Sequence, residues 1–568
     1  MTGDGSKAKG SAAAPGFWIT LVAMTLSSSM ILVDQTAVPL ATPDAIKGLG
    51  ANLDEGQWLL TANILPLAAF MVLGGRLGDL LGLRRVFLAG AVIFLLATSA
   101  AGAAQDITWM LAARAVQGFG AACMMPTAVA IVSAVAPEDR RGMALGVLAG
   151  GSAFFAALGP VLGGLLTSID WRLVFFVNVP LAALAIALTL RGTPPLAPSE
   201  KGRVRDLDFA GMATLALSAA GIVYGLSRVS DVPLTDPGAF VPILGGFACG
   251  ALFVFIELRV SDPLLDLRLF RHKNFLASNI SQVLAGSIEL GMGFLLPFLL
   301  LLVIGVSPAV AGIALIPATV PIILAGPLAG RAFDRIGGRV PLVAGFLILA
   351  ASGAALALAV PSETVWALIP GLILQGIALG IVLTVNDPVG LNAVPEGDRG
   401  RAAGMINTSE QLGGAVGIAV LLAVELGYYR DRLYSDLAER GIHPTQEQVD
   451  EVRNFLQEAE QKGLSNARET PLVRGVVNDI VQTHVDGFQL SFTVGAVIAL
   501  VGAVACFILV RKEDRVGVGP VFGRRSRWRY ATSGRSPALT RHPPGLDAHP
   551  VGGPGTSAGD AAADPPEP

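Results

Sequence analysis

The sequence predicts an all-α polytopic membrane protein with fourteen transmembrane helices, arranged as two six-helix repeats plus an inserted helix pair. Of its 568 residues, 53% are hydrophobic and only 15% are charged, which excludes a soluble domain with an ordinary polar surface. Fourteen apolar segments are long enough to cross a bilayer, since about 20 residues suffice, and two polar motifs recur in register. The predicted spans are 17–39, 57–80, 86–105, 108–134, 142–167, 173–191, 208–228, 238–259, 275–304, 309–331, 340–360, 365–388, 402–426 and 486–511.

Lysine and arginine gather in alternate short loops, and this asymmetry predicts the orientation. One set of loops carries pairs or groups of basic residues, such as Arg84 and Arg85, whereas the opposite short loops contain only Lys47, Arg172 and Arg228. Because basic loops stay in the cytoplasm, we expect both termini to be cytoplasmic in a multi-pass protein of the cell membrane.

The spans define a domain organisation, with spans 7 and 8 inserted between the repeats. A single long loop separates spans 13 and 14. It is predicted to be a solvated amphipathic hairpin on the outer rim, or else a lid or a partner-docking segment. The C-terminal tail is rich in Gly, Pro, Ser and Arg, which predicts disorder. The parts are a cytoplasmic tail (1–16), an N-terminal bundle (17–191), a cytoplasmic linker (192–207), the inserted pair (208–259), a C-terminal bundle (275–511) with its extracellular loop (427–485), and a disordered cytoplasmic tail (512–568).

Two loops at equivalent places, after spans 2 and 10, both read G-x-x-x-D-x-x-G followed by arginine. Glycine allows helix ends and a tight turn to approach closely, aspartate can cap or pair across the turn, and arginine holds the loop on the cytoplasmic side. We expect these loops to control conformation. Their candidate residues are Gly75, Asp79, Gly82, Arg84 and Arg85 in the first loop, and Asp334, Arg335, Gly338 and Arg339 in the second.

This pair of loops resembles the signature loop of the major facilitator superfamily, found between helices 2 and 3 of each half. The second copy matches the pattern D-R-x-G-G-R in full, whereas the first has Leu80 and Leu83 where basic residues are usual. A further motif, Pro137–Gly142 before span 5, is echoed by Pro395–Gly400 before span 13. In its number of spans, fourteen rather than twelve, the chain resembles the drug:proton antiporter family of the EmrB/QacA type.

Ionisable residues are rare inside the predicted spans, and each is therefore a candidate for function. Asp34 lies 17 residues into span 1, about 25 Å from the cytoplasmic edge. Arg114 enters from the opposite side in span 4 and lies about 9 Å deep. In a hydrocarbon core about 30 Å thick, the two side chains are therefore expected to lie at a similar depth in the membrane. We expect an ion pair, which either takes part in proton transfer or is a static contact.

The sequence around these residues resembles family motifs. Leu32–Val38 is similar to L-x-D-x-T-x-V, and Leu111–Gly120 is similar to L-x-x-R-x-x-Q-G-x-G. The resemblance implies that Arg114 takes part in proton coupling. Trp171–Pro180 opens span 6 in a form typical of the same family.

Span 5 contains Gly159, Pro160, Gly163 and Gly164, which resemble the antiporter motif G-P-x-x-G-G. Proline removes a backbone hydrogen bond and glycine allows close helix contact, so the segment is predicted to bend between two states. The resemblance implies an exporter. Ordinary packing of small residues is the alternative.

Two glutamates lie in the spans of the second half. Glu289 is near the middle of span 9, and Glu410 is about two turns into span 13. Each is predicted to be a second proton-coupling site or a counter-charge for a cationic substrate, with a structural role as the alternative. Asp387 precedes Pro388 at the end of span 12 and is predicted to be a helix-end feature.

The sequence lacks the residue patterns that several other kinds of functional site require. All five histidines are assigned to loops or the tail, which leaves carboxylates as the intramembrane proton carriers. The three cysteines lie in apolar segments without metal-ligand spacing, so neither a metal nor a disulfide is expected. The phosphate-binding pattern G-x-x-x-x-G-K-[ST] does not occur. Basic residues lie in short loops, which disfavours nucleic-acid binding.

These observations predict a proton-coupled secondary active exporter of hydrophobic small molecules, cations among them, and not an enzyme. It is expected to need no cofactor beyond the proton gradient, to bind substrate and protons within the lipid bilayer, and to be a monomer. One alternative is an exporter of an endogenous product such as an antibiotic, lipid or siderophore. The other is a non-transporting receptor or assembly factor whose 427–485 loop is the working part.

Overall fold

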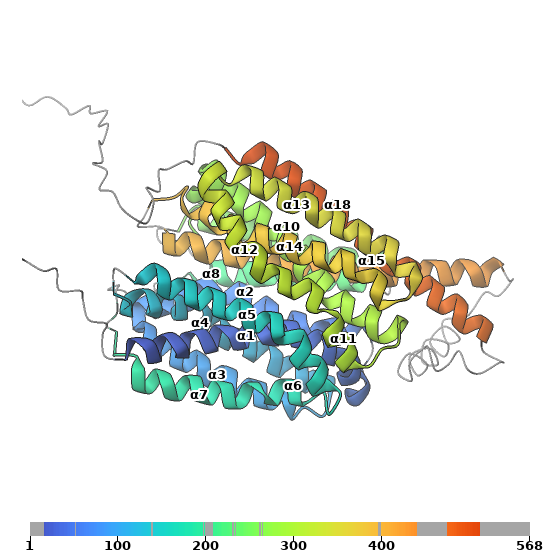
Figure 1. Cartoon of the computed structure of the whole chain (residues 1–568), viewed down its shortest axis with the longest axis horizontal. Coiled ribbons are helices and arrows are strands. Elements are labelled where there is room, and N and C mark those ends of the chain that lie inside the picture. Colours follow the sequence, from blue (N-terminus) through green and yellow to red (C-terminus); the bar gives the residue numbers. More distant parts are fainter. Residues whose placement is uncertain are drawn as a thin grey trace, which may run out of the picture. The chain divides into compact units, whose positions relative to one another are not determined.

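A computed structural model gives the fold of the chain (Figure 1). It describes residues 16–511 except 52, 138–139, 197, 199–207, 230–231, 233, 261–262, 264, 396–398 and 440–473. All of these belong to the first of two compact units, Met1–Val516. The described part is helical and contains no strand. The predicted tails, most of the 192–207 linker and the centre of the 427–485 loop lie outside the described residues.

Among the described residues, fourteen helices are long and apolar enough to cross a membrane, which confirms the predicted number of spans. Two spans are each built from two helices, α6 with α7 and α11 with α12. The N-terminal half contains α1 (Phe17–Leu49), α2 (Leu53–Leu81), α3 (Leu83–Gly102), α4 (Ile107–Val135), α5 (Arg141–Thr167), α6 (Leu173–Phe176) and α7 (Asn178–Gly192). The inserted pair is α8 (Phe209–Arg228) and α9 (Pro237–Glu257).

The C-terminal half begins with the 3-10 helix η2 (Leu267–Arg271). Its first span is α10, which continues as a π-helical turn, η3. The elements are α10 (Lys273–Phe298), η3 (Leu299–Val303), α11 (Pro308–Ala314), α12 (Ile316–Ile336), α13 (Arg339–Ala359), η4 (Val360–Ser362), α14 (Val365–Leu391), α15 (Arg399–Glu439) and α18 (Arg474–Leu509).

The two repeated loops make their turns at equivalent glycines. Gly82 and Gly337, the last glycines of the two G-x-x-x-D-x-x-G motifs, adopt φ angles of 98° and 80°. This left-handed region is costly for residues that carry a Cβ atom. The turn geometry therefore explains why glycine occupies this place in both copies.

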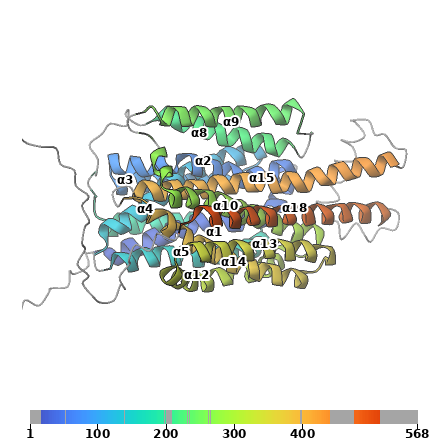
Figure 2. The same ribbon diagram turned by 90° about the horizontal axis from the view of Figure 1, so that it is seen from above.

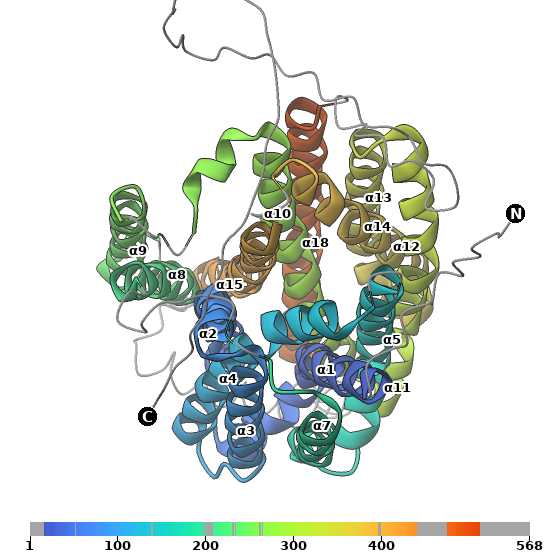
Figure 3. The ribbon, with the colours of Figure 1, turned by 90° about the vertical axis from the view of Figure 1, so that its left-hand side faces the viewer.

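Helix packing repeats between the halves. In the first half α1 packs on α5, and α4 packs on α2 and α3. In the second half α10 packs on α15, and α14 packs on α12 and α13. The halves meet along two seams, α2 with α15 and α5 with α11 and α12 (Figure 3). The second span of each half thus contacts the fifth span of the other, as expected for a parallel internal repeat.

The inserted pair lies at the edge of one seam. Helix α8 packs against both α2 and α15, and α9 packs against α8 (Figure 2). Apolar side chains on α9, such as Val241 and Phe247, are exposed. Exposed apolar surface of this extent suits contact with lipid.

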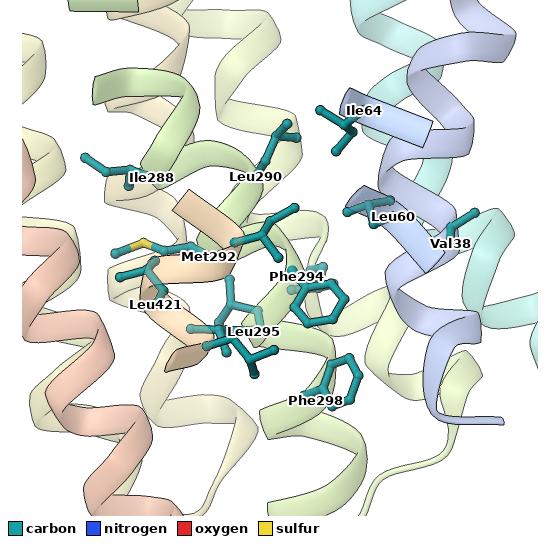
Figure 4. Close-up of a cluster of buried hydrophobic side chains, with 14 of the residues drawn as sticks. Val38, Leu60, Ile64, Ile288, Leu290, Met292, Phe294, Leu295, Phe298 and Leu421 are labelled. Atoms are coloured by element: carbon teal, nitrogen blue, oxygen red, sulfur yellow. The ribbon is translucent and has the colours of Figure 1, made fainter. Parts of the chain in front are cut away.

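The two ends of the helix bundle differ. At one end, α15 and α18 project beyond the other helices (Figure 2); we term this the extended end. The opposite end, the basic end, carries Arg84, Arg85 and Arg339. Near the extended end the halves share one buried apolar cluster, in which Val38, Leu60 and Ile64 face Leu290, Phe294 and Phe298 (Figure 4).

Helices continue into the predicted 427–485 loop from both of its ends. Helix α15 continues to Glu439, and α18 begins at Arg474. Gly427, directly after the apolar segment, does not end the helix, and residues 428–439 contain neither glycine nor proline that would stop it. Helix α1 likewise continues to Leu49, ten residues beyond the predicted span.

Candidate functional site

Asp34 and Arg114 are in direct contact inside the N-terminal half. Nη1 of Arg114 on α4 donates to Oδ2 of Asp34 on α1 over 2.6 Å. The Asp34 side chain is 2% exposed and that of Arg114 is completely buried. The pairing expected from their equal depth in the spans is confirmed.

Two buried amides complete the surroundings of Asp34. Gln117, one turn after Arg114 on α4, donates from Nε2 to Oδ1 of Asp34 over 3.1 Å and accepts from Arg114 Nη1 over 2.7 Å. Asn178 on α7 donates to Asp34 Oδ1 over 3.3 Å. Sequence reasoning did not select either amide as a site residue. The available signal is a polar side chain within an apolar span, and the two amides lie inside the motifs Leu111–Gly120 and Trp171–Pro180.

Arg114 is held from two further sides. Its Nε donates to the Leu59 carbonyl on α2 over 2.6 Å, and its guanidinium lies 5.7 Å from the centre of the Phe175 ring on α6. Its Nη2 is buried and has no hydrogen-bond partner. Helices α1, α2, α4, α6 and α7 therefore meet at one charge pair, and a shift of any of them changes the bonds of Asp34.

A second polar network occupies the C-terminal half. Gln282 on α10 donates to Oε2 of Glu410 on α15 and accepts from Asn386 Nδ2 on α14 over 2.5 Å. Ser281 donates to Asn386 Oδ1 over 2.6 Å. A chain of amides thus links the Glu410 carboxylate of α15 to two further helices, α10 and α14.

Glu289 and Asp387 lie within electrostatic reach of this network. Both repel the negative charge of Glu410, and Oε2 of Glu289 is buried without a hydrogen-bond partner. Asp387, predicted to be a helix-end feature, lies four residues before the end of α14 at Leu391. The structure therefore brings Glu289 and Glu410 together and adds Asp387.

The two networks are bridged across the halves. Gln35 on α1 donates from Nε2 to Oε1 of Gln411 on α15 over 3.0 Å, and both side chains are buried. These residues directly follow Asp34 and Glu410 in the sequence. This contact between the halves was not predicted, since neither glutamine is ionisable.

The glycine motif of α5 packs on two neighbours at once. A Cβ atom on Gly163 would lie 2.7 Å from the Ala37 carbonyl oxygen of α1, and one on Gly159 would meet Thr36. A Cβ on Gly164 would meet the Pro308 carbonyl of α11, in the other half. Helix α5 is one helix through Pro160. The motif therefore allows close contact between the halves, and its proposed bending stays a prediction.

The repeated loops contact neighbouring elements at the basic end. Arg84 donates to the Leu190 carbonyl at the end of α7 over 2.9 Å. In the second loop Arg339 lies over the Phe507 ring of α18 at 4.4 Å, and a Cβ on Gly338 would meet Val389 of α14. Asp334 and Arg335 are exposed there. Gly75 packs near Pro126 of α4, and Asp79 follows it within α2.

The prediction that no histidine lies in an apolar segment was wrong. His484 belongs to the last span, Gln482–Leu509, and is buried. Its Nδ1 lies 2.7 Å from Oε1 of Glu425 on α15. The predicted span began at residue 486, because the apolar run alone was used to place its start. No group of three or more His, Cys, Asp or Glu in the described part of the chain could hold a metal ion.

Comparison with known proteins assigns the family. The profile of the Major Facilitator Superfamily matches residues 17–418. The chain belongs to the major facilitator superfamily. This agrees with the paired halves, the repeated loops and the inserted pair, and it confirms the family that the motifs predicted.

Relatives within the superfamily include resistance proteins. The multidrug resistance protein Stp of Mycobacterium tuberculosis (strain CDC 1551 / Oshkosh) is 31% identical over 433 residues, 76% of this chain and 80% of Stp. The tetracenomycin C resistance and export protein of Streptomyces glaucescens is 29% identical over 503 residues, 88% of this chain and 92% of that protein.

Solved structures support the same fold. A bacterial homologue of the human lysosomal transporter Spinster, in an inward-facing and unoccupied conformation, aligns with a TM-score of 0.61 and 18% identity. The alignment covers 88% of this chain and 98% of that one.

Proposed function

We propose that the protein is a proton-coupled exporter of hydrophobic small molecules, cationic ones among them, in the cell membrane. The observation that carries this proposal is the buried Asp34–Arg114 pair, a titratable carboxylate on a membrane-spanning helix. A charge pair in that place is costly unless it serves a function. The resistance and export functions named for relatives support the exporter direction.

The loop charges support an orientation. Basic residues mark the basic end, which then faces the cytoplasm together with both termini. The extended end, where α15 and α18 project, faces outward. In this orientation the shared apolar cluster around Leu60 and Phe294 closes the outer side.

Asp34 is the proposed proton carrier. Arg114, Gln117 and Asn178 satisfy its two oxygens in the present state. Exchange of a proton requires that at least the arginine withdraws, since a neighbouring positive charge favours the carboxylate. Movement of α4 relative to α1 would separate them, and the two halves then rock about a site between them.

The C-terminal network is the proposed substrate-binding region. Glu289 and Glu410 are two carboxylates within one electrostatic environment, suited to a cation or to a second proton. Amides of Gln282 and Asn386 add hydrogen-bonding groups to this network. Apolar side chains of the neighbouring spans suit a hydrophobic body. No cofactor is required in this scheme, and a monomer contains both networks.

A second candidate is an exporter of an endogenous product on the same scaffold. The similarity to a tetracenomycin C export protein favours it, because such products are themselves hydrophobic small molecules. A non-transporting receptor or assembly factor is less well supported, since it has no use for the Asp34–Arg114 network.

Reconstituted proteoliposomes test the proposal. Ethidium, a lipophilic cation, serves as the probe, and its movement is followed under an imposed pH gradient with and without a protonophore. Asp34→Asn should abolish gradient-driven flux, because the amide keeps the shape but exchanges no proton. Asp106→Asn is the matched control: Asp106 is an exposed N-cap of α4, and asparagine caps equally well. Undiminished gradient-driven flux in Asp34→Asn would remove Asp34 from the mechanism.

A further inference from the structure

A second buried contact between two ionisable side chains lies outside the two networks described above. Glu425 on α15 and His484 on α18 are 3% and 8% exposed, with 2.7 Å between Oε1 and Nδ1. Both lie near the ends of their spans, Arg401–Tyr428 and Gln482–Leu509, where the two helices leave the bundle at the extended end. The pair therefore joins α15 to α18 at the base of their projecting segments.

The surroundings of this pair are otherwise apolar. A cavity beside it is lined by eight apolar side chains together with Glu425 and His484. Its free volume of about 20 Å³ accommodates a water molecule and nothing drug-sized. The apolar lining residues are Phe294, Leu295, Phe298, Leu302, Val303, Leu422, Leu426 and Phe488.

Stability alone gives a weak reason for such a pair. Replacing a buried ion pair by apolar residues of similar volume is often neutral or stabilising, because both charges lose their hydration. Imidazole is also the side chain whose charge ordinarily changes between about pH 5 and 8. A histidine next to a carboxylate and a water-sized cavity is therefore equipped to bind a proton from the outer solution.

The pair lies directly behind the contact that closes the outer side. Phe294 and Phe298 line its cavity, and the same two rings face Leu60 and Ile64 of the other half (Figure 4). Helix α10 changes to the π-helical turn η3 at this level, and η3 packs against α18. Such turns are rare and frequently occur at functional sites.

We propose that Glu425 and His484 form an outer proton-binding site whose protonated form favours the closed outer side. The proton adds to the imidazole nitrogen lone pair, and no other bond forms or breaks. The resulting imidazolium makes a charge-assisted hydrogen bond to Glu425 and ties α15 to α18 behind Phe294 and Phe298. This inference rests on the proposed orientation and on the use of external protons.

The sign of the pH effect follows from the pair. At low external pH the imidazole is protonated, the ion pair is complete and the outer side is closed. As the external pH rises the proton is lost, the tie weakens and opening becomes easier. Proton entry from outside would thus drive the transition that closes the outer side after substrate release.

Three other charged groups belong to the elements around this site. On α18, Asp486 accepts a hydrogen bond from Gln482 at the exposed surface. Glu363 follows η4, and Arg432 lies further along α15; each of them, like His484, takes part in a further interaction. Helix α10 and η3 contribute only apolar side chains to the cavity.

Spin-label distances across the outer ends measure the predicted opening. Labels are attached through Ile169→Cys in the N-terminal half and Trp366→Cys in the C-terminal half, which are 77% and 81% exposed. The three native cysteines are replaced by alanine, and the full chain is placed in lipid nanodiscs between pH 5.5 and 8.5. The ratio of open to closed distances should rise at least about fivefold with pH, the lower end of typical couplings.

Variants of the pair separate the possible outcomes. His484→Asn and Glu425→Gln should each abolish the pH response and populate the open form. His484→Lys keeps a permanent cation and should remain closed at every pH. This variant tests the proposal independently if the neutral variants fold poorly. His272→Asn, an exposed histidine at the basic end, is the matched control and should behave as wild type.

The same measurements in an Asp34→Asn background separate this site from the main mechanism. If His484→Asn keeps the full pH response and Asp34→Asn loses it, the outer site is overturned while proton-coupled export stands. If His484→Asn loses the response but Asp34→Asn still exports ethidium in a gradient-dependent manner, the proposed role of Asp34 fails and the outer site stands.

Discussion

Gln35 and Gln411 form a hydrogen bond between the two halves of the protein, with 3.0 Å between Nε2 of Gln35 and Oε1 of Gln411. Both side chains are buried. Gln35 follows Asp34 and Gln411 follows Glu410. Successive residues on a helix point in different directions, so one turn of α1 offers Asp34 to α4 and Gln35 to α15. Any motion that separates the halves here breaks this bond and displaces the helical turns that carry both carboxylates.

Gln35→Ala should destabilise the state described here relative to the alternate one. The change leaves Gln411 Oε1 buried without a donor, which costs about 1–3 kcal/mol. Because about 1.4 kcal/mol changes an equilibrium constant tenfold, the ratio of outer-closed to outer-open forms should fall by roughly tenfold. Spin-label distances across the outer ends measure this ratio.

The control for this prediction is Gln482→Ala, which removes a glutamine that is bonded to Asp486 at the exposed surface. A double-mutant cycle of Gln35→Ala with Gln411→Ala should show coupling, because the residues share one bond. Additive effects of the two changes would mean that the contact carries no conformational energy.

Segment length and charge distribution were sufficient for most of the fold. The number of spans follows from apolar length alone, and the contact of Asp34 with Arg114 follows from equal depth, because two charges in one bundle gain by pairing. The helix ends are a different matter. Beyond Leu426 the chain turns polar, yet the helix continues through Gly427 and persists to Glu439. The same rule leaves His484 outside the last span, because the predicted span begins too late, at residue 486 instead of Gln482.

The missed site residues share a physical reason. Gln117 and Asn178 are uncharged, and an amide in an apolar span can equally bond its own backbone. Only the packing of α4 and α7 on α1 shows that both point at Asp34. Asp387 precedes Pro388, a context that predicts a helix end, and α14 ends four residues later, at Leu391.

Gly164→Ala should force α5 and α11 apart. The added methyl group would meet the Pro308 carbonyl, and overpacking of this kind costs about 1–3 kcal/mol. Because this contact joins the halves, we expect a shift towards the outer-open form and a lower export rate, both measurable in the assays above.

Gly150→Ala on the same helix provides the comparison, since nothing lies within 4 Å of the new methyl group. It should leave both readouts unchanged, or raise stability slightly through helix propensity. Equal effects of the two substitutions would attribute the loss to helix α5 itself and not to its contact with α11.

Asp334→Ala and Arg335→Ala should slow turnover with little change in substrate affinity. These residues lie in the second repeated loop at the basic end, away from the polar networks, and should act on the balance between states. We expect kcat to fall about tenfold, within the range of such couplings, with KM nearly unchanged in initial-rate measurements on ethidium. Arg271→Ala, an exposed arginine of η2, is the control. A selective rise in KM at constant kcat would contradict this role.

Glu289→Gln should weaken export of cationic substrates and spare neutral ones. Oε2 of Glu289 is buried and has no partner, so this oxygen is available to a ligand. At an effective dielectric of about 20, a carboxylate about 6 Å from a cation contributes roughly 3 kcal/mol. Much of this is offset by loss of hydration of both charges, and we expect KM for ethidium to rise by about tenfold. Nile red, a neutral dye, should be exported at the wild-type rate.

The control for Glu289→Gln is Glu363→Gln, the same chemical change after η4, at the extended end. The two dyes distinguish the possible roles of Glu289, because charge recognition acts on the cation alone and proton transfer acts on every substrate. Equal impairment of both dyes would identify Glu289 as a second proton carrier beside Glu410. Unchanged export of both would leave it a structural residue, and cation recognition would then have to come from Glu410 or Asp387.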